Sequence, residues 1–195
     1  TVEKKGNILF VGTKKQAQDA IKQEAERCKM PYVNQRWLGG TLTNNVTINN
    51  SVKKLKRYQE DRDLGVFDNL SKKEASRKIK QLAKLEHYLT GIKNMRYLPK
   101  AIFIVDTKKE ELAIKEAKKL GIKIIGLVDT NSDPSMLDYP IPGNDDAIRA
   151  VKLICSVFAN AALEGASASV EASAGADNVG IDDQRFDDKT DDTKV

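Results

Sequence analysis

The stretch Asn7-Ile8-Leu9-Phe10-Val11-Gly12 is a short apolar run that ends in glycine, a pattern typical of a buried strand in a parallel sheet. Directly after it, Thr13 offers a helix N-cap and Gln16 stands three residues further on, as in a capping box. Small and apolar residues then recur at helical spacing to about Met30, and residues 31–33 favour a second short strand. This order of strand, helix and strand predicts the beginning of an α/β sheet.

The same order returns in the second half of the chain. Residues 101–105 and 122–128 favour strands, and Thr107 with Glu110 repeats the capping box. A last helix is expected from Asp145 to about Leu163, with Asn144 as its N-cap. Strands that alternate with helices of this length predict a doubly wound parallel sheet that helices cover on both faces.

Between these two halves lies a strongly basic segment. Residues 51–100 hold 14 Lys and Arg against 6 Asp and Glu, a net charge of +8. A capping box begins at Ser71, and the apolar residues on each side of the preceding turn follow one narrow helical stripe. Two long helices with thin apolar seams predict an antiparallel coiled-coil hairpin. We therefore expect a discontinuous α/β core, residues 1–43 and 97–164, with the hairpin, residues 44–96, inserted into it.

The acidic end of the chain conceals how basic its body is. Residues 1–163 carry 30 Lys and Arg against 19 Asp and Glu, a net charge of +11, whereas residues 164–195 carry 3 against 9, a net charge of −6. A basic body of this kind favours a polyanion as partner. From Gly165 onward Ala, Ser and Gly give way to Asp, so residues 165–195 are expected to form a disordered acidic tail.

Cysteine usage and hydropathy indicate a protein of a reducing compartment. Cys28 and Cys155 stand far apart, each inside an apolar helical pattern, and are expected to be reduced and buried. No apolar run is expected to approach the roughly 20 residues that cross a bilayer, and no signal peptide is recognised. These features predict a cytoplasmic protein without a membrane partner.

The strand ends, where α/β enzymes bind their ligands, lack the residues expected for catalysis. The run from Val11 to Gln16 has neither glycine pattern of the nucleotide-binding motifs, although Lys14 and Lys15 beside a helix N-terminus can hold a phosphate. The lone histidine falls on the basic hairpin, away from the sheet. We expect no cofactor and no enzyme activity. The alternative is an α/β enzyme that binds a nucleotide or a sugar phosphate.

One strand-end loop carries two carboxylates. Asp129 and Asp133 follow the strand at residues 122–128, and oxygen ligands of this kind suit Mg²⁺. The favoured alternative is a loop whose polar side chains satisfy its own backbone and which closes at Pro134. The two aspartates are therefore weak candidates for a metal site, and no metal is expected.

The most distinctive string of the chain is Arg36-Trp37-Leu38-Gly39-Gly40-Thr41-Leu42-Thr43-Asn44. Its arginine can bind a phosphate as a fork, its tryptophan can stack or pack, and its paired glycines allow a close approach of the backbone. A structural interpretation stays open beside the binding one, with Trp37 as a lid on the sheet.

With this string, the run Phe103-Ile104-Val105-Asp106 and the stretches Leu127–Pro134 and Ile141–Arg149, the chain resembles the family of the second protein of the bacterial small ribosomal subunit. The resemblance implies a flavodoxin-like sheet with a protruding coiled coil, packed on 16S ribosomal RNA between the head and the body of the subunit. It also implies neighbouring small-subunit proteins as partners, including the large one that recruits mRNA. Family members carry further residues ahead of the point where this chain starts, so it is expected to be N-terminally truncated.

Duplex RNA is recognised through its backbone and its shape, which suits clustered Lys and Arg on a projecting helical pair. The expected function is that of a structural constituent of the small ribosomal subunit that supports translation and has no small-molecule substrate. The expected RNA contacts lie on the hairpin and on loops of the core: Lys53, Lys54, Lys56, Arg57, Lys72, Lys73, Arg77, Lys78 and Lys80, with Lys14, Lys15, Arg36, Trp37, Asn44 and Arg96.

Overall fold

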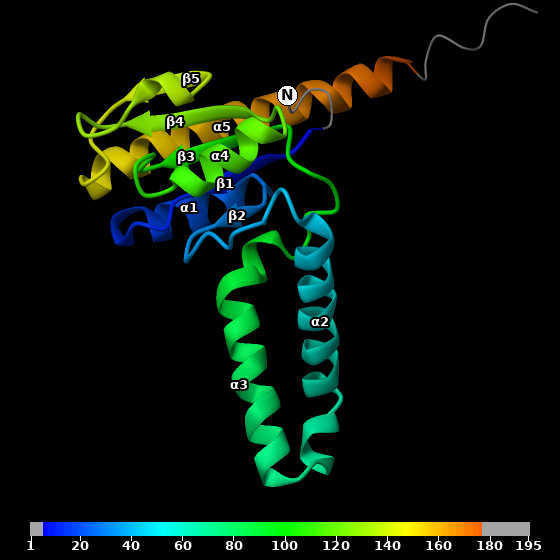
Figure 1. Ribbon diagram of the computed structural model, residues 1–195. Helices are drawn as coiled ribbons and strands as arrows, with labels where there is room; N and C mark the ends of the chain where they lie inside the picture. Colours follow the sequence, from blue (N-terminus) through cyan, green and yellow to red (C-terminus); the bar gives the residue numbers. More distant parts are fainter. Residues whose placement is uncertain (1–5, 177–195) are drawn as a thin grey trace, which may run out of the picture.

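Five parallel strands form one sheet in the order β2-β1-β3-β4-β5 (Figure 1). This computed structural model describes residues 6–176, and the side chains of residues 6–167. The neighbouring strands at residues 8–11 and 101–105 are buried along their whole length, as expected for a parallel sheet covered on both faces. The strands are β1 (Ile8–Val11), β2 (Tyr32–Val33), β3 (Ala101–Val105), β4 (Lys123–Val128) and β5 (Tyr139–Pro142).

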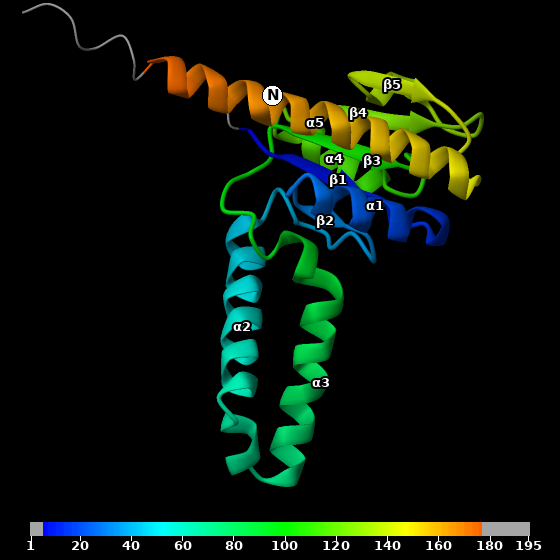
Figure 2. The ribbon, with the colours of Figure 1, turned by 180° about the vertical axis from the view of Figure 1, so that it is seen from behind.

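Helices cover both faces of the sheet, which confirms the predicted doubly wound α/β fold (Figure 1 and Figure 2). On one face α1 and α5 pack over Phe10 and Phe103, whose rings meet edge to face with 5.6 Å between centroids. On the other face α4 packs over Leu9 and Ile102. Successive strand residues point to opposite faces, so β1 contributes to both cores. The helices are α1 (Lys15–Arg27), α2 (Asn45–Asp63), α3 (Lys72–Leu89), α4 (Glu111–Lys119) and α5 (Ile148–Ala176).

The fifth strand, which the sequence analysis does not predict, closes one edge of the sheet. Its sequence Tyr139-Pro140-Ile141-Pro142 contains two prolines, and prolines disfavour strands because they lack an N–H group. Gly143 donates its N–H to the carbonyl oxygen of Val128 at 3.0 Å, so by the alternation of a strand both prolines face the open edge. An edge that lacks these donors is a poor template for pairing with another chain.

Two long helices, α2 and α3, extend side by side away from the sheet (Figure 1). Ser71 caps α3 as predicted, since its hydroxyl accepts the N–H of Glu74 at 3.4 Å and donates to the Glu74 carboxylate at 2.8 Å. The seam between the helices consists of buried apolar residues that are continuous with the core of the sheet: Ile48, Val52, Leu55, Phe67, Leu82 and Leu89. The predicted helical pair is thus present, and its supercoiling stays a prediction.

A glycine fixes the foot of this pair against β2. After α3 the chain enters a short 3₁₀ helix, η3 (Thr90–Ile92), in which Gly91 packs on the backbone of Tyr32. A β-carbon built on Gly91 would lie 2.1 Å from the Tyr32 carbonyl oxygen and 2.6 Å from Cδ2 of its ring. Only glycine permits so close an approach of two backbones, and this contact sets where the pair leaves the sheet.

α5 is longer than the sequence analysis predicts. The expected end near residue 163 is wrong, because the helix runs to Ala176, and residues 165–176 are helical rather than part of a disordered tail. Alanine has the highest helix propensity of all residues, and alanine is frequent in this segment. The remainder of the expected tail, residues 177–195, lies outside the described residues. The predicted start of this helix at Asp145, capped by Asn144, is also wrong, because the helix begins at Ile148. Asn144 Oδ1 instead accepts the N–H groups of Asp146 at 2.7 Å and Ala147 at 3.1 Å, which closes a turn ahead of the helix.

One side of α5 is buried and the other is apolar but exposed. Val151 and Cys155 are fully buried, whereas Leu153 and Val157 are 64% and 60% exposed. Over Ile148–Ser167 the helix has a mean hydropathy of 1.2 and therefore the length and composition of a membrane span, which corrects the expectation that no apolar run approaches that length. A core helix that packs on a sheet with one face passes the same test. Both cysteines are free and buried, as predicted.

Replacing Gly91 by alanine is expected to destabilise the fold by about 2–3 kcal/mol, at the upper end of the usual cost of overpacking. The new methyl group meets a backbone carbonyl that cannot move aside. The melting temperature should fall by about 5–10 °C, measured by circular dichroism with urea unfolding in parallel. Gly39→Ala is the matched control, because a β-carbon there would lie an ordinary 3.6 Å from Leu112. Equal stability of the two variants would show that this contact does not fix the pair.

Candidate nucleic-acid interface

The exposed face of α3 carries a basic groove. Its cations are Lys73, Arg77, Lys80 and Lys84, which line a hollow of about 480 Å³ together with Ser76 and Gln81. Residues at this spacing lie on one face of a helix, and from the first lysine to the last the helix rises about 16 Å. None of the four cations forms an ion pair with another of the described residues. The groove therefore presents four uncompensated positive charges in a row.

The position of the groove follows from the seam on the opposite side of the helix. Leu82 and Leu89 are buried against α2, so the long polar side chains on the opposite face of α3 must point outward. Gln81 reaches round to α2, where its Oε1 accepts the hydroxyl of Tyr58 at 3.2 Å. The apolar seam that joins the two helices thus also orients the basic side chains.

Two further lysines predicted for the interface lie against aromatic rings. The Lys54 ammonium lies 5.3 Å from the ring centroid of Tyr58, and the Lys78 ammonium lies 5.7 Å from that of Phe67. The two rings themselves meet edge to face at 6.3 Å. Cation–π attraction holds such ammonium groups over the ring, so these lysines close the outer end of the seam as well as carry charge.

The surface of α2 has mixed charge. Lys56 lines a hollow together with Glu60, Arg62 and Asp63, and Arg62 forms ion pairs with Asp63 at 3.1 Å and with Glu86 at 3.2 Å. Exposed ion pairs of this kind contribute little to stability. Their carboxylates do, however, reduce the positive potential that would attract a polyanion to this surface. The α2 face is therefore a weaker anion site than the α3 face.

The structure divides the residues predicted from the sequence into groups. It brings Lys73, Arg77 and Lys80 into one groove and adds Lys84, which the sequence analysis missed although its spacing of four residues from Lys80 indicates the same face. Several candidates stay exposed outside the groove: Lys15, Arg36, Asn44, Lys53, Arg57, Lys72 and Arg96. Lys14 and Trp37 do not stay exposed, and each is held by carboxylates of the core.

Glu116 organises the distinctive loop that leads into α2. Its Oε1 accepts the indole N–H of Trp37 at 3.1 Å and the N–H of Gly40 at 2.7 Å. Its Oε2 accepts the N–H of Leu42 at 3.0 Å and both the N–H and the hydroxyl of Thr43 at 3.1 Å. Trp37 is buried, so it packs on the core rather than standing free to stack on a partner. The structural interpretation of this residue is thus the one that the contacts favour.

The chemistry of this carboxylate is set by its donors. Burial by itself would raise the pKa of Glu116, but the hydrogen bonds from Trp37 and from the loop N–H groups lower that pKa below its ordinary value. Gly40 adopts a φ of +87° inside the same loop, a conformation that favours glycine. Gly39 has no such requirement and is exposed, so only one glycine of the pair is needed for backbone reasons.

At the carboxyl ends of β1 and β3, the carboxylate of Glu110 accepts hydrogen bonds that a bound phosphate could otherwise accept. The N–H of Thr13 donates to Glu110 Oε1 at 3.2 Å, and the Thr13 hydroxyl donates to the same oxygen. Burial raises the pKa of Glu110. The predicted capping boxes at Thr13 and Thr107 are therefore wrong, since Thr13 bonds across the sheet and the Thr107 hydroxyl is buried with no partner among the described residues.

Lys14 is held by three carboxylates at the same edge. Its ammonium lies 2.7 Å from Asp145, 2.6 Å from Asp146 and 3.8 Å from Asp106. Burial lowers the pKa of Lys14, but the hydrogen bonds and charges of these aspartates raise it well above its usual value. A phosphate brought to this edge would meet paired lysine and surplus carboxylate. This arrangement speaks against a nucleotide or sugar phosphate as ligand here.

The weak metal candidates of the sequence separate in the structure. Asp129 lies with Asp145 and Asp146 so that one carboxylate oxygen of each is within 4.8 Å of the others. Asp133 instead accepts the N–H of Ser135 at 2.9 Å and its hydroxyl at 2.8 Å, as in the self-satisfied loop that the sequence analysis favours. Such oxygens suit a hard cation, and the Lys14 ammonium is the cation in contact with two of the three carboxylates.

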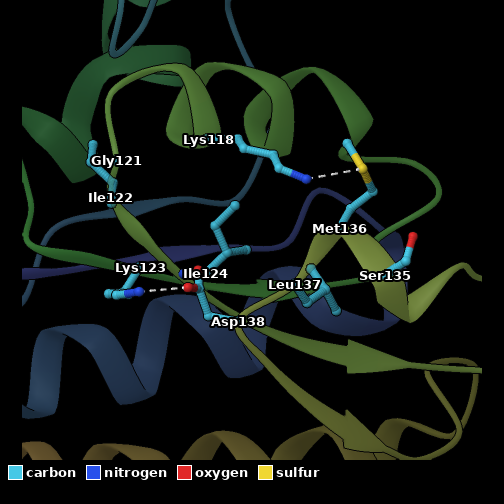
Figure 3. Close-up of a pocket in the computed structure, with 9 residues that line it drawn as sticks. All are labelled: Lys118, Gly121, Ile122, Lys123, Ile124, Ser135, Met136, Leu137 and Asp138. Atoms are coloured by element: carbon cyan, nitrogen blue, oxygen red, sulfur yellow. Dashed lines mark hydrogen bonds and ion pairs between the residues drawn. The ribbon is translucent and has the colours of Figure 1, made fainter.

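A third hollow, of about 290 Å³, lies between the end of α4 and the segment before β5 (Figure 3). Its charged groups are engaged within the protein, because Asp138 accepts the Lys123 ammonium at 2.7 Å and the N–H of Ile124 at 2.9 Å. The Lys118 ammonium approaches the sulfur of Met136 at 3.5 Å. These bonds join β4 to the segment before β5, so the charged groups that they engage are not free for a ligand.

Comparison with known proteins gives one family. The sequence model of the family ribosomal protein S2 matches residues 1–165. A curated relative, the small ribosomal subunit protein uS2 of Coprothermobacter proteolyticus, is 56% identical over 158 residues, which is 81% of this chain and 59% of that relative. The chain thus spans less than two thirds of the length of this relative.

Replacing Glu116 by glutamine is expected to destabilise the protein by about 2–4 kcal/mol at pH 7, because an amide cannot accept all five hydrogen bonds. The pKa of Glu116 is lowered by folding, so its stabilisation is complete above the pKa of the unfolded chain, about 4.3, and is lost as the pH falls through the folded-state pKa. The gap between wild type and variant, measured by urea unfolding, should therefore shrink below about pH 4.

Glu111→Gln on the same helix is the control for this measurement. Glu111 is exposed and pairs with Lys115 at 2.6 Å, an interaction worth about 0.3–0.5 kcal/mol. If Glu116→Gln cost no more than Glu111→Gln, the carboxylate would not be the organiser of the loop.

Proposed function

Since this chain belongs to the ribosomal protein S2 family, we propose that it is a structural component of the small ribosomal subunit and that it binds 16S ribosomal RNA through the basic groove of α3. The observation that carries the RNA contact is the row from Lys73 to Lys84, four cations on one helical face without an acidic partner among the described residues. Such a row is the electrostatic footprint of a nucleic-acid contact.

The groove acts on phosphates rather than on bases. Each Lys or Arg that neutralises a phosphate releases condensed counterions, and this release supplies sequence-independent affinity. The deep and narrow major groove of an RNA duplex keeps its base edges from side chains, so a rigid helix that follows the backbone is a suitable reader of its shape. A helix braced by a buried seam loses little conformational entropy when it binds.

Residues of the core extend this contact in the proposal. Lys15, Arg36, Asn44 and Arg96 are exposed on loops or at helix ends and supply further phosphate contacts. Lys14 and Trp37 act indirectly, the first through its ion pairs at the sheet edge and the second through its bond to Glu116. The helical pair, residues 44–96, is thus the main RNA element, and the α/β core, residues 1–43 and 97–164, supports it.

The proposal has consequences for location and activity. A protein with this role is cytoplasmic, sits within the small subunit, supports translation and catalyses no reaction. Its other partners are neighbouring small-subunit proteins, and we include the large mRNA-recruiting protein among them on the strength of the family resemblance.

Replacing Lys73, Arg77, Lys80 and Lys84 together by alanine is expected to weaken binding to 16S ribosomal RNA and to flatten its salt dependence. The slope of log K against log salt concentration should fall by about three, from the loss of up to four phosphate contacts. Filter binding between about 50 and 200 mM salt measures the slope. Alanine keeps the helix, which circular dichroism checks.

A second quadruple variant provides the control. Lys22, Lys108, Lys119 and Lys152 are exposed lysines elsewhere on the fold, and their replacement by alanine changes the net charge by the same amount. This variant should leave the slope almost unchanged. If the two variants lowered the slope equally, only net charge would matter, and the α3 groove would not be the RNA-binding surface.

A further inference from the structure

A pocket of about 510 Å³ lies at the foot of the helical pair. Its walls come from four segments: the start of β1, the turn from α1 into β2, η3, and the chain that follows η3. The walls are fixed, since Gly91 packs directly on the Tyr32 backbone and the N–H of Ile8 donates to the sulfur of Met30 at 3.5 Å. The volume is in the range of sites for small ligands, about 300–1,000 Å³.

One residue of this pocket has an unfavourable backbone conformation. Lys29, directly after the end of α1, has a φ of +57°, a place where glycine is the usual residue. Two backbone hydrogen bonds end the helix here. The Lys29 N–H donates to the carbonyl oxygen of Glu26 at 3.2 Å, and the Met30 N–H donates to that of Ala25 at 2.9 Å. This conformation ends α1 and leaves the Lys29 side chain, an ammonium, in the lining of the pocket.

The other lining groups form three sets. Apolar surface comes from Met30, Met95 and the ring of Tyr32. Carboxamides come from Asn7 and Asn94. Positive charge comes from Lys29 and from Lys93, whose ammonium donates to Gln59 at 2.6 Å.

The one carboxylate in the lining is engaged within the protein. Glu26 accepts the hydroxyl of Tyr32 at 2.8 Å through Oε1, so one of its two oxygens is occupied by the pocket's own tyrosine. Apolar surface for a flat ring, amides for a hydrogen-bonding edge and ammonium groups for an anion are the recognition elements of a nucleotide.

We propose that this pocket binds a single unpaired nucleotide of RNA, with its base against Met30 and Met95, its base edge at the two asparagines and its phosphate toward Lys29 and Lys93. The inference rests on the proposed function and deepens it, because it adds a contact to a base beside the phosphate contacts of α3. A duplex is too wide for the pocket, whereas a bulged nucleotide can leave its stack and enter.

Three RNA probes test the proposal. The first is a fully paired duplex, the second is the same duplex with one bulged nucleotide (each of the four bases in turn), and the third carries an abasic residue in the bulge, so that it keeps the phosphate and lacks the base. For at least one base the bulged duplex should bind the wild-type chain about tenfold more tightly than the abasic one, as expected for one stacked base. Fluorescence anisotropy measures the three affinities.

The double variant K29G/N94A should reduce this preference to about twofold or less. Glycine relieves the backbone conformation at position 29, so the melting temperature should stay the same or rise, which separates lost binding from lost folding. The matched control K22A/N131A removes an exposed lysine and an exposed asparagine outside the pocket and should keep the preference.

Each outcome decides the matter. Equal binding of the bulged and abasic duplexes by the wild type overturns the pocket and leaves the α3 contact standing. A preference that survives in K29G/N94A assigns the nucleotide to another part of the surface and also overturns it. Failure of the wild type to bind all three probes removes the proposed RNA function together with the pocket.

Discussion

The carboxylate of Glu116 accepts five hydrogen bonds from one loop, and the position of the helical pair depends on that loop. The loop must turn the chain out of the sheet and into α2, so its backbone N–H groups point inward where no strand can accept them. A buried N–H group without a partner costs about 1–3 kcal/mol. Glu116 accepts the buried N–H of Leu42 together with the part-buried N–H groups of Gly40 and Thr43. A neutral side chain could not serve as well, because charge-assisted hydrogen bonds are the stronger kind.

From this anchor the apolar core continues into the pair without a break. Trp37 and Leu42 lie beside Ile48 and Leu55, and the same buried cluster includes Leu9 of the sheet. The pair is therefore an extension of one core of the sheet rather than a separate unit on a linker. That continuity allows a projecting element with a narrow seam to hold a definite direction. The proposed contact between the basic face of α3 and a nucleic-acid backbone requires such a direction.

Local patterns predicted most of this architecture, and contacts between distant residues account for what they missed. Periodicity alone indicates β1, β3, α2 and α3, and the Ser71 cap is a bond within one turn. In contrast, Thr13 bonds Glu110 across 97 positions and Trp37 bonds Glu116 across 79, so a motif search within a few residues assigns the threonines to caps that do not form. The strand β5 was not predicted, because its two prolines are compatible only with an edge strand. In the candidate interface, composition predicted the basic face, but only the structure separates the groove of α3 from the compensated surface of α2.

The contact of Gly91 with Tyr32 has a consequence for the order in which the chain folds. The strands β1 and β3 pair directly although the whole helical pair lies between them in the sequence, and closing a loop costs more entropy as the loop grows. If α2 and α3 associate first, the two ends of the insertion are already neighbours, and the effective loop between β1 and β3 becomes shorter. Because α2 and α3 precede β3 in the chain, the pair can form during synthesis before β3 is available to join the sheet.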